Sequence, residues 1–107
     1  MGVPGKRTVE RGEYRRYIQS TEWRRTRERY WASKLPHDCY CCGTPRRPGF
    51  HLHHRTYKNL GRERLMDLVP VCPRCHDEIH ALHKSAPEWQ RRGLWYATQR
   101  VRKQRGG

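Results

Sequence analysis

The residues of this chain best suited to metal chemistry are cysteines in two Cys-x-x-Cys pairs, Cys39 with Cys42 and Cys72 with Cys75. Thiolates at this spacing can both turn toward one ion, so each pair suits half of a tetrahedral zinc site. Disulfides are the alternative, but the odd count of five cysteines and the lack of an apolar signal segment before them favour zinc. Cys41 lies inside the first pair and is interpreted as a spare thiol, although an exchange of ligand roles with Cys42 stays open.

A second group of residues able to do chemistry consists of histidines between and after the cysteine pairs. His76 and His80 lie four residues apart in an expected helix, so both imidazoles project from one face. On an expected strand, His51 and His53 share one face and His54 points to the opposite one. Imidazole can take a proton from water near neutral pH and can hold a divalent cation without neutralising it. Hydrolysis of a phosphodiester needs both functions, so the pattern predicts a site with one metal and one general base.

The elements that position these groups follow from length and composition. A chain of 107 residues with 34% hydrophobic residues predicts one small domain with a modest core, for which a structural metal is a suitable staple. We divide it into a flexible basic arm (1–12), an N-terminal helical segment (13–36), the metal-bearing domain (37–84), and a C-terminal helix with a basic tail (85–107).

Local patterns predict individual helices and strands within these segments. Trp23, Tyr30 and Trp31 lie on one face of an expected helix over 21–34 that begins at the N-cap Ser20 and ends before Pro36. The other expected elements are a strand over 50–55, a loop over 56–67, a strand over 68–71, a helix over 72–84, and a last helix that begins at a capping box over 85–88 and contains Gly93.

The charge of the chain indicates its class of partner. There are 24 Lys and Arg against 10 Asp and Glu, a formal net charge of +14, and such a field attracts polyanions. Nucleic acid is favoured because aromatic residues and metal motifs lie among the arginines; a solvated basic surface or an acidic membrane is the alternative. No apolar run approaches the roughly 20 residues that span a bilayer, so we expect a soluble, cytoplasmic protein. The candidates for holding phosphates are Arg55, Lys58, Arg62 and Arg64.

Three motifs occur in a fixed order: Cys39 to Gly43, His53 to Tyr57, and Asp67 to His76. Over roughly residues 39–80 the chain closely resembles the HNH endonucleases, in the phage-type subset with a four-cysteine zinc ribbon. The resemblance implies an α+β fold. Its expected form is a small ββα-metal domain stapled by the zinc ribbon, with flanking N- and C-terminal helices.

The resemblance also implies a role for each matching residue. His53 matches the first ligand of the catalytic metal, His54 the general base, and His76 a second metal ligand. His80 matches a further helix histidine that some members use near the metal or the phosphate. Asp67 stands where the family often has an asparagine that braces the loop holding the base. Aspartate keeps the acceptor of that asparagine and loses its amide donor.

The function implied by the resemblance is metal-dependent hydrolysis of DNA that leaves a 5′-phosphate and a 3′-hydroxyl. It implies structural Zn²⁺ and a catalytic divalent ion (Mg²⁺, Mn²⁺, Ni²⁺ or Zn²⁺). A monomer would nick, whereas a weak dimer or two events would cut both strands. The similarity to short phage proteins suggests processing or packaging of viral DNA beside terminase subunits, in the host cytoplasm. A catalytically inactive zinc-ribbon DNA-binding module, supported by Asp67, and a ribonuclease or RNA-binding protein are the alternatives.

Overall fold

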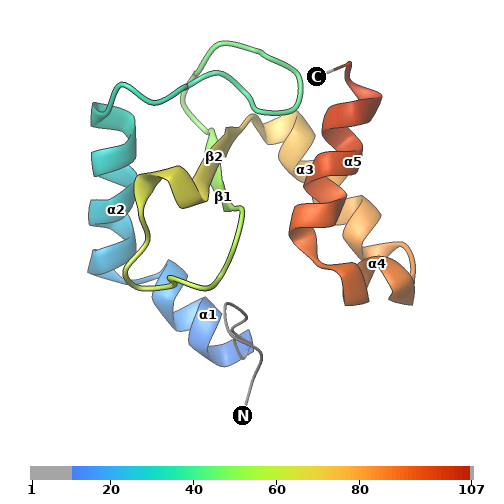
Figure 1. The fold of residues 1–107 in the computed structure, drawn as a ribbon, viewed down its shortest axis with the longest axis horizontal. Helices are drawn as coiled ribbons and strands as arrows, with labels where there is room; N and C mark the ends of the chain where they lie inside the picture. The colour runs from blue at the N-terminus through green and yellow to red at the C-terminus, as the bar shows by residue number, and fades with distance from the viewer. Residues whose placement is uncertain (1–10, 107) are drawn as a thin grey trace. The chain divides into compact units, whose positions relative to one another are not determined.

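Helices predominate in residues 11–106, the part of the chain that the computed structural model describes (Figure 1). The elements are α1 (Arg11–Ile18), α2 (Thr21–Ala32), β1 (His51–His54), the 3₁₀-helix η1 (Leu65–Asp67), β2 (Leu68–Val71), α3 (Pro73–Lys84), α4 (Pro87–Arg92) and α5 (Leu94–Gln104). The arm predicted over 1–12 lies outside the described residues except for its last two, which belong to α1. None of the described helices is long and apolar enough to cross a membrane.

The backbone divides into two units, which are described separately. The first unit contains residues 11–35 and 54–68, and the second contains residues 36–53 and 69–106. Strands β1 and β2 pair in one antiparallel sheet, and together with the helices they confirm the predicted α+β class. Along β1 the burial alternates, with Leu52 and His54 buried and His51 exposed, so His54 points to the Leu52 side as strand geometry requires.

Helix α2 is the main helix of the first unit. The Ser20 side chain accepts a hydrogen bond from the backbone N–H of Trp23 at 3.1 Å, which confirms the predicted N-cap. Trp23 and Tyr30 are buried as expected, and Thr26 joins them because its hydroxyl donates to a backbone carbonyl of the preceding turn. The helix ends at Ala32, two residues before the predicted end, where Ser33 takes over as the C-cap.

The core of the second unit forms around the sheet, α3 and α5. The buried side chains of this cluster come from the cysteine motifs, the second strand and the two helices: Cys39, Cys41, Val69, Val71, Cys72, Cys75, Ile79, Ala97 and Val101. Several cysteines are therefore core residues. A metal held by these sulfurs would tie together the segments on which the core depends.

The prediction of a single last helix is wrong, because the structure has two helices there, α4 and α5. Gly93 has φ of +94°, a conformation that ends α4 and starts α5. The predicted capping box is wrong as well. Ser85 donates to the carbonyl of Leu82 at 2.7 Å and so ends α3, while the N-cap of α4 is Ala86, which makes no side-chain cap bond.

Candidate functional site

Four cysteine sulfurs converge in the second unit. The Sγ atoms of Cys39, Cys42, Cys72 and Cys75 all lie within 4.8 Å of one another. The Sγ atoms of Cys42 and Cys72 are 3.8 Å apart. Four sulfurs placed tetrahedrally at about 2.3 Å from a zinc ion would be separated by about 3.8 Å, so this pair already has the spacing of a zinc site. The predicted metal-binding cysteines are thus close enough to hold one ion.

Local hydrogen bonds orient these sulfurs. The backbone N–H of Cys72 donates to Cys39 Sγ, and that of Cys75 donates to Cys72 Sγ, each at 3.4 Å. The pKa of Cys39 is lowered to about 3, first by a hydrogen bond from Cys41 and also by the backbone of Cys72, against the opposing effect of burial. Burial raises the pKa of Cys75, so a bound cation is what would favour its thiolate.

Cys41 and Cys42 differ in their surroundings, and this difference bears on which of the two is the metal ligand. Cys42 is exposed and belongs to the converging set. Cys41 is 1% exposed, lies in the hydrophobic cluster, and its sulfur is 3.6 Å from the carbonyl oxygen of Thr98. Cys41 therefore serves as a small core residue in this structure, and Cys42 occupies the ligand position.

Three histidines form a second cluster in the same unit. Nitrogen atoms of His53, on β1, and of His76 and His80, on α3, all lie within 4.8 Å of one another. All three side chains are half-buried. Their ring centroids are 5.2 Å apart for His53 and His76 and 4.3 Å apart for His76 and His80. Three imidazoles converging in this way are a suitable donor set for a divalent transition ion.

The surroundings of His80 favour its neutral ligand form. The pKa of His80 is lowered to about 4, chiefly by burial and then by the neighbouring His76 and other cationic groups. A histidine that stays neutral at physiological pH offers its lone pair to a metal without competition from a proton. His53 Nδ1 lies 3.4 Å from the hydroxyl oxygen of Thr98, a contact that orients the ring as partners of metal-bound histidines do.

His51, expected to be a solvent-facing strand residue, is exposed. Its ring stacks on that of His76, with centroids 3.7 Å apart and planes inclined by 13°. His51 does not belong to the converging ligand set. In this structure it packs against a ligand candidate.

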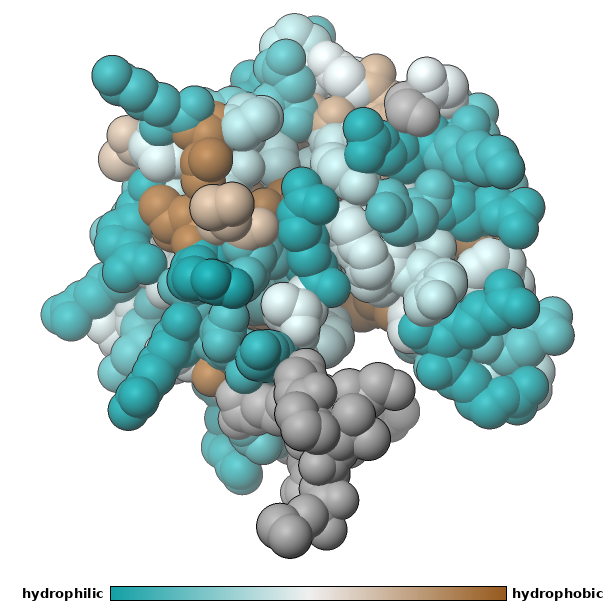
Figure 2. All heavy atoms as spheres, viewed as in Figure 1, coloured by the Kyte–Doolittle hydropathy of each residue, from teal (hydrophilic) through white to brown (hydrophobic). Residues whose placement is uncertain are grey.

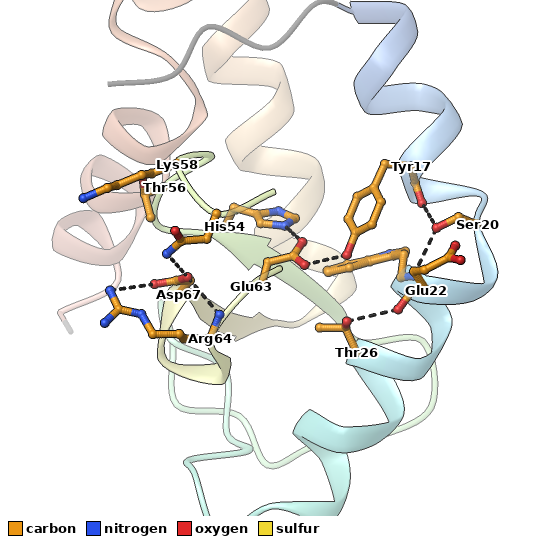
Figure 3. Close-up of polar contacts among 12 residues, drawn as sticks. Tyr17, Ser20, Glu22, Thr26, His54, Thr56, Lys58, Glu63, Arg64 and Asp67 are labelled. Carbon is orange, nitrogen blue, oxygen red and sulfur yellow. Dashed lines mark hydrogen bonds and ion pairs between the residues drawn. The ribbon is translucent and has the colours of Figure 1, made fainter. Parts of the chain in front are cut away.

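His54, the predicted general base, lies in the first unit with its side chain only 1% exposed. Its Nε2 is 2.8 Å from a carboxylate oxygen of Glu63 (Figure 3). Its ring stacks against Trp23, with centroids 5.0 Å apart, and against Tyr57 at 5.3 Å. His54 is thus enclosed by aromatic rings and bonded to a buried carboxylate.

Asp67, predicted to brace the loop, makes the contacts that such a role requires. Its Oδ2 accepts from the Asn59 side chain at 2.9 Å and from the backbone N–H of Arg64 at 3.0 Å (Figure 3). Its backbone carbonyl accepts from the N–H of Arg55 at 2.7 Å. Each of these partners donates, so a carboxylate satisfies them without the amide donor that asparagine would add.

The four cations proposed to hold phosphates are all exposed and all lie on residues 55–64 of the first unit. They are Arg55, Lys58, Arg62 and Arg64. Arg64 Nη2 lies 3.9 Å from Asp67 Oδ1. Because the Arg64 side chain is 77% exposed, its guanidinium stays accessible to a phosphate. Hydrophilic side chains also cover most of the face shown in Figure 2, in keeping with the charge of the chain.

Sequence analysis missed Glu63 and Thr98, which contact His54 and His53, and Tyr17, which donates to Glu63. One signal was available for Glu63, because it is a carboxylate between two arginines in a basic loop. Tyr17 and Thr98 are distant in sequence from the residues that they contact, so no local pattern identifies them. Comparisons with protein-family models, curated proteins and solved structures find no match to this chain.

Proposed function

We propose that this protein is a metal-dependent DNA endonuclease of the HNH type. The observation that supports the proposal most is the convergence of three imidazoles, His53, His76 and His80, in the unit that also gathers four cysteine sulfurs. Such paired sites fit one structural ion and one reactive ion. The resemblance of the cysteine and histidine motifs to HNH enzymes supplies the reaction class.

The residues of the chain would divide the reaction among them. His53, His76 and His80 would hold a divalent ion (Mg²⁺, Mn²⁺, Ni²⁺ or Zn²⁺), which when bound stabilises charge on the phosphate and the leaving oxygen. His54 would take a proton from water as the water oxygen bonds to phosphorus. The bond from phosphorus to the 3′ oxygen then breaks, and that oxygen takes a proton from solvent. The products are a 5′-phosphate and a 3′-hydroxyl.

DNA is the proposed partner because the exposed cations suit a phosphate backbone. Arg55, Lys58, Arg62 and Arg64 come from one stretch of the first unit and would contact phosphates, giving affinity with weak sequence preference. One metal centre cuts one strand, so a monomer would nick, and a weak dimer would cleave both strands.

Supercoiled-plasmid cleavage tests this proposal. Wild-type protein is incubated with Mg²⁺, Mn²⁺, Ni²⁺ or EDTA, and nicked plasmid is then treated with DNA ligase. We expect nicking that requires a divalent ion and nicks that ligase reseals, because sealing needs a 5′-phosphate beside a 3′-hydroxyl. Nicking that persists in EDTA, or nicks that ligase cannot seal, would contradict the proposed chemistry.

A second candidate function is a zinc-stapled DNA-binding module without catalysis. The observation that favours it is the burial of His54, whose enclosed ring cannot meet bulk water in this conformation. Catalysis through His54 requires its aromatic surroundings to open when substrate binds. Plasmid binding without cleavage in all four metals, and with equal affinity for wild type and His54→Ala, would establish the binding module.

An RNA substrate would be served by the same positive charge. Cleavage of DNA and RNA of matched length at one salt concentration separates the two substrates, and we expect DNA to be cut faster.

A role beside a phage terminase, in the cytoplasm of the host cell, is proposed from the resemblance alone. Co-purification with terminase subunits tests it. If the protein neither binds the terminase subunits nor cuts faster in their presence, that result would count against the role.

A further inference from the structure

Glu63 is a buried carboxylate whose two oxygens both accept hydrogen bonds. Oε2 lies 2.8 Å from His54 Nε2, and Oε1 accepts from the Tyr17 hydroxyl at 2.5 Å (Figure 3). The side chain is 1% exposed. Burial alone would raise the pKa of Glu63, but the hydrogen bonds from His54 and Tyr17 outweigh it and the pKa lies below its usual value. The group is therefore a carboxylate at neutral pH.

A carboxylate determines which nitrogen of His54 carries the proton. Ionised carboxylate oxygens only accept hydrogen bonds, so in the neutral form that a general base must have, the proton between His54 and Glu63 belongs to Nε2. The lone pair of the ring is then on Nδ1. Two stacked rings, Trp23 and Tyr57, limit rotation of the imidazole and so keep Nδ1 from exchanging places with Nε2.

Nδ1 of His54 is buried and has no hydrogen-bond partner among the residues that the structure describes. A histidine that serves only to fill a core has both nitrogens bonded, because an unpaired buried acceptor costs free energy. Here one nitrogen is held by a charged partner while the other remains a free acceptor. This asymmetry is what a general base requires.

We propose that Glu63 is the positioning residue of the general base. Its carboxylate holds His54 in the Nε2–H tautomer, so that Nδ1 is the nitrogen left to meet the attacking water once the aromatic surroundings open, and it stabilises the imidazolium that forms. The proposal rests on the endonuclease function proposed above. In the step itself, a proton moves from water to Nδ1, the Nε2 proton stays on nitrogen, and Glu63 remains ionised.

Tyr17 completes the arrangement as a second positioning group. Its hydroxyl occupies the Glu63 oxygen that His54 does not use, which restrains rotation of the carboxylate. The pKa of Tyr17 is raised, first by burial and then by the hydrogen bond to Glu63, so the phenol stays protonated and continues to donate. Loss of this hydroxyl should weaken the orientation of Glu63 without removing its charge.

Variant rates test the positioning role. Glu63→Gln keeps the shape and an accepting oxygen but removes the charge, Tyr17→Phe removes the second donor, and Glu28→Gln on the exposed face of α2 is the control. We expect Glu63→Gln to lower the single-turnover nicking rate by about 10²–10⁴-fold at unchanged plasmid affinity, since general bases of this kind contribute that much. Tyr17→Phe should lower the rate less, and Glu28→Gln not at all.

The ¹⁵N chemical shifts of the His54 ring in the zinc-loaded protein give a second readout. They report which ring nitrogen carries the proton, which a purely structural role of Glu63 would not determine. We expect the Nε2–H tautomer in wild type and a mixture of tautomers in Glu63→Gln. A wild-type ring protonated on Nδ1 at mildly alkaline pH would overturn the proposal. If Glu63→Gln fails to fold, Tyr17→Phe provides the same two readouts.

The outcomes separate this inference from the function on which it rests. Wild-type protein that cuts no substrate with any metal defeats the endonuclease function, and the positioning role fails with it. Wild-type protein that cuts, with activity lost in His54→Ala and retained in full by Glu63→Gln, defeats only the role of Glu63.

Discussion

Removing the metal from the four-cysteine site should unfold the second unit. Cys39, Cys72 and Cys75 belong to the same buried cluster as Val71 and Ile79, so their sulfurs are part of the core. Structural zinc contributes about 10–16 kcal/mol in small zinc domains. A folded domain has a total stability of only about 5–15 kcal/mol. Because these two quantities are of the same size, the unit should lose its cooperative fold when the ion is taken away.

The assay follows zinc release and structure together during titration with a strong chelator. Released zinc is measured with a colour indicator, and amide hydrogen exchange is followed at Ile79 on α3 and Val101 on α5, both fully buried. We expect one ion per four-cysteine site and loss of protection at both amides as the ion leaves. Full protection at both amides in the zinc-free protein would refute the reasoning.

The neighbouring cysteines provide a matched pair of variants. Cys42→Ser removes a sulfur of the converging set and should abolish tight zinc binding. Cys41→Ser changes a core residue outside that set and should retain zinc, because serine can still donate to Cys39, with a loss of about 1–3 kcal/mol of stability from the buried hydroxyl. If Cys41→Ser loses zinc and Cys42→Ser keeps it, the assignment of the two sulfurs is reversed.

Three further predictions concern the loop, the metal-binding histidines and the break between α4 and α5. Asp67→Asn should leave plasmid cleavage within about threefold, whereas Asp67→Leu should cost about 2–6 kcal/mol in a denaturant titration because two donors lose their acceptor. His80 has a folded pKa near 4 and an ordinary value of 6.5, so the unfolded chain takes up the proton first. Stability should therefore fall as pH drops from 6.5 toward 4, and His80→Gln should flatten the melting temperature over that window. Gly93→Ala should cost about 1–3 kcal/mol through backbone strain alone, because its φ is +94° and no atom lies within 4 Å of an added Cβ.

Local chemistry explains what the sequence predicted correctly. Helix α2 follows from a Ser20 cap and the periodic Trp23 and Tyr30, all within a few turns of one another. Each Cys-x-x-Cys pair is prearranged by its own two-residue spacing, and one zinc ion needs two such pairs, so the sequence predicted the set of four sulfurs. Such features depend on neighbours in the chain, so a pattern of residue types is sufficient to find them.

The features that sequence analysis missed depend on contacts between distant segments. Glu63, in the loop after β1, forms hydrogen bonds with His54 at the end of β1 and with Tyr17 on α1. No spacing rule connects these three residues. The break at Gly93 was missed because the apolar stripe continues past it toward Ala97, while the backbone takes a conformation suited to glycine.

The most direct test of the endonuclease account is the nicking rate of two histidine variants from one helix. His76 and His83 both lie on α3, but only His76 belongs to the converging cluster. With saturating Mn²⁺ and confirmed zinc content, we expect His76→Ala to nick supercoiled plasmid at least about 100-fold more slowly than wild type, because its ion is lost. His83→Ala should match wild type within about threefold, because the half-buried His83 lies outside the converging cluster. Equal nicking by both variants would contradict the assignment of the metal to these histidines.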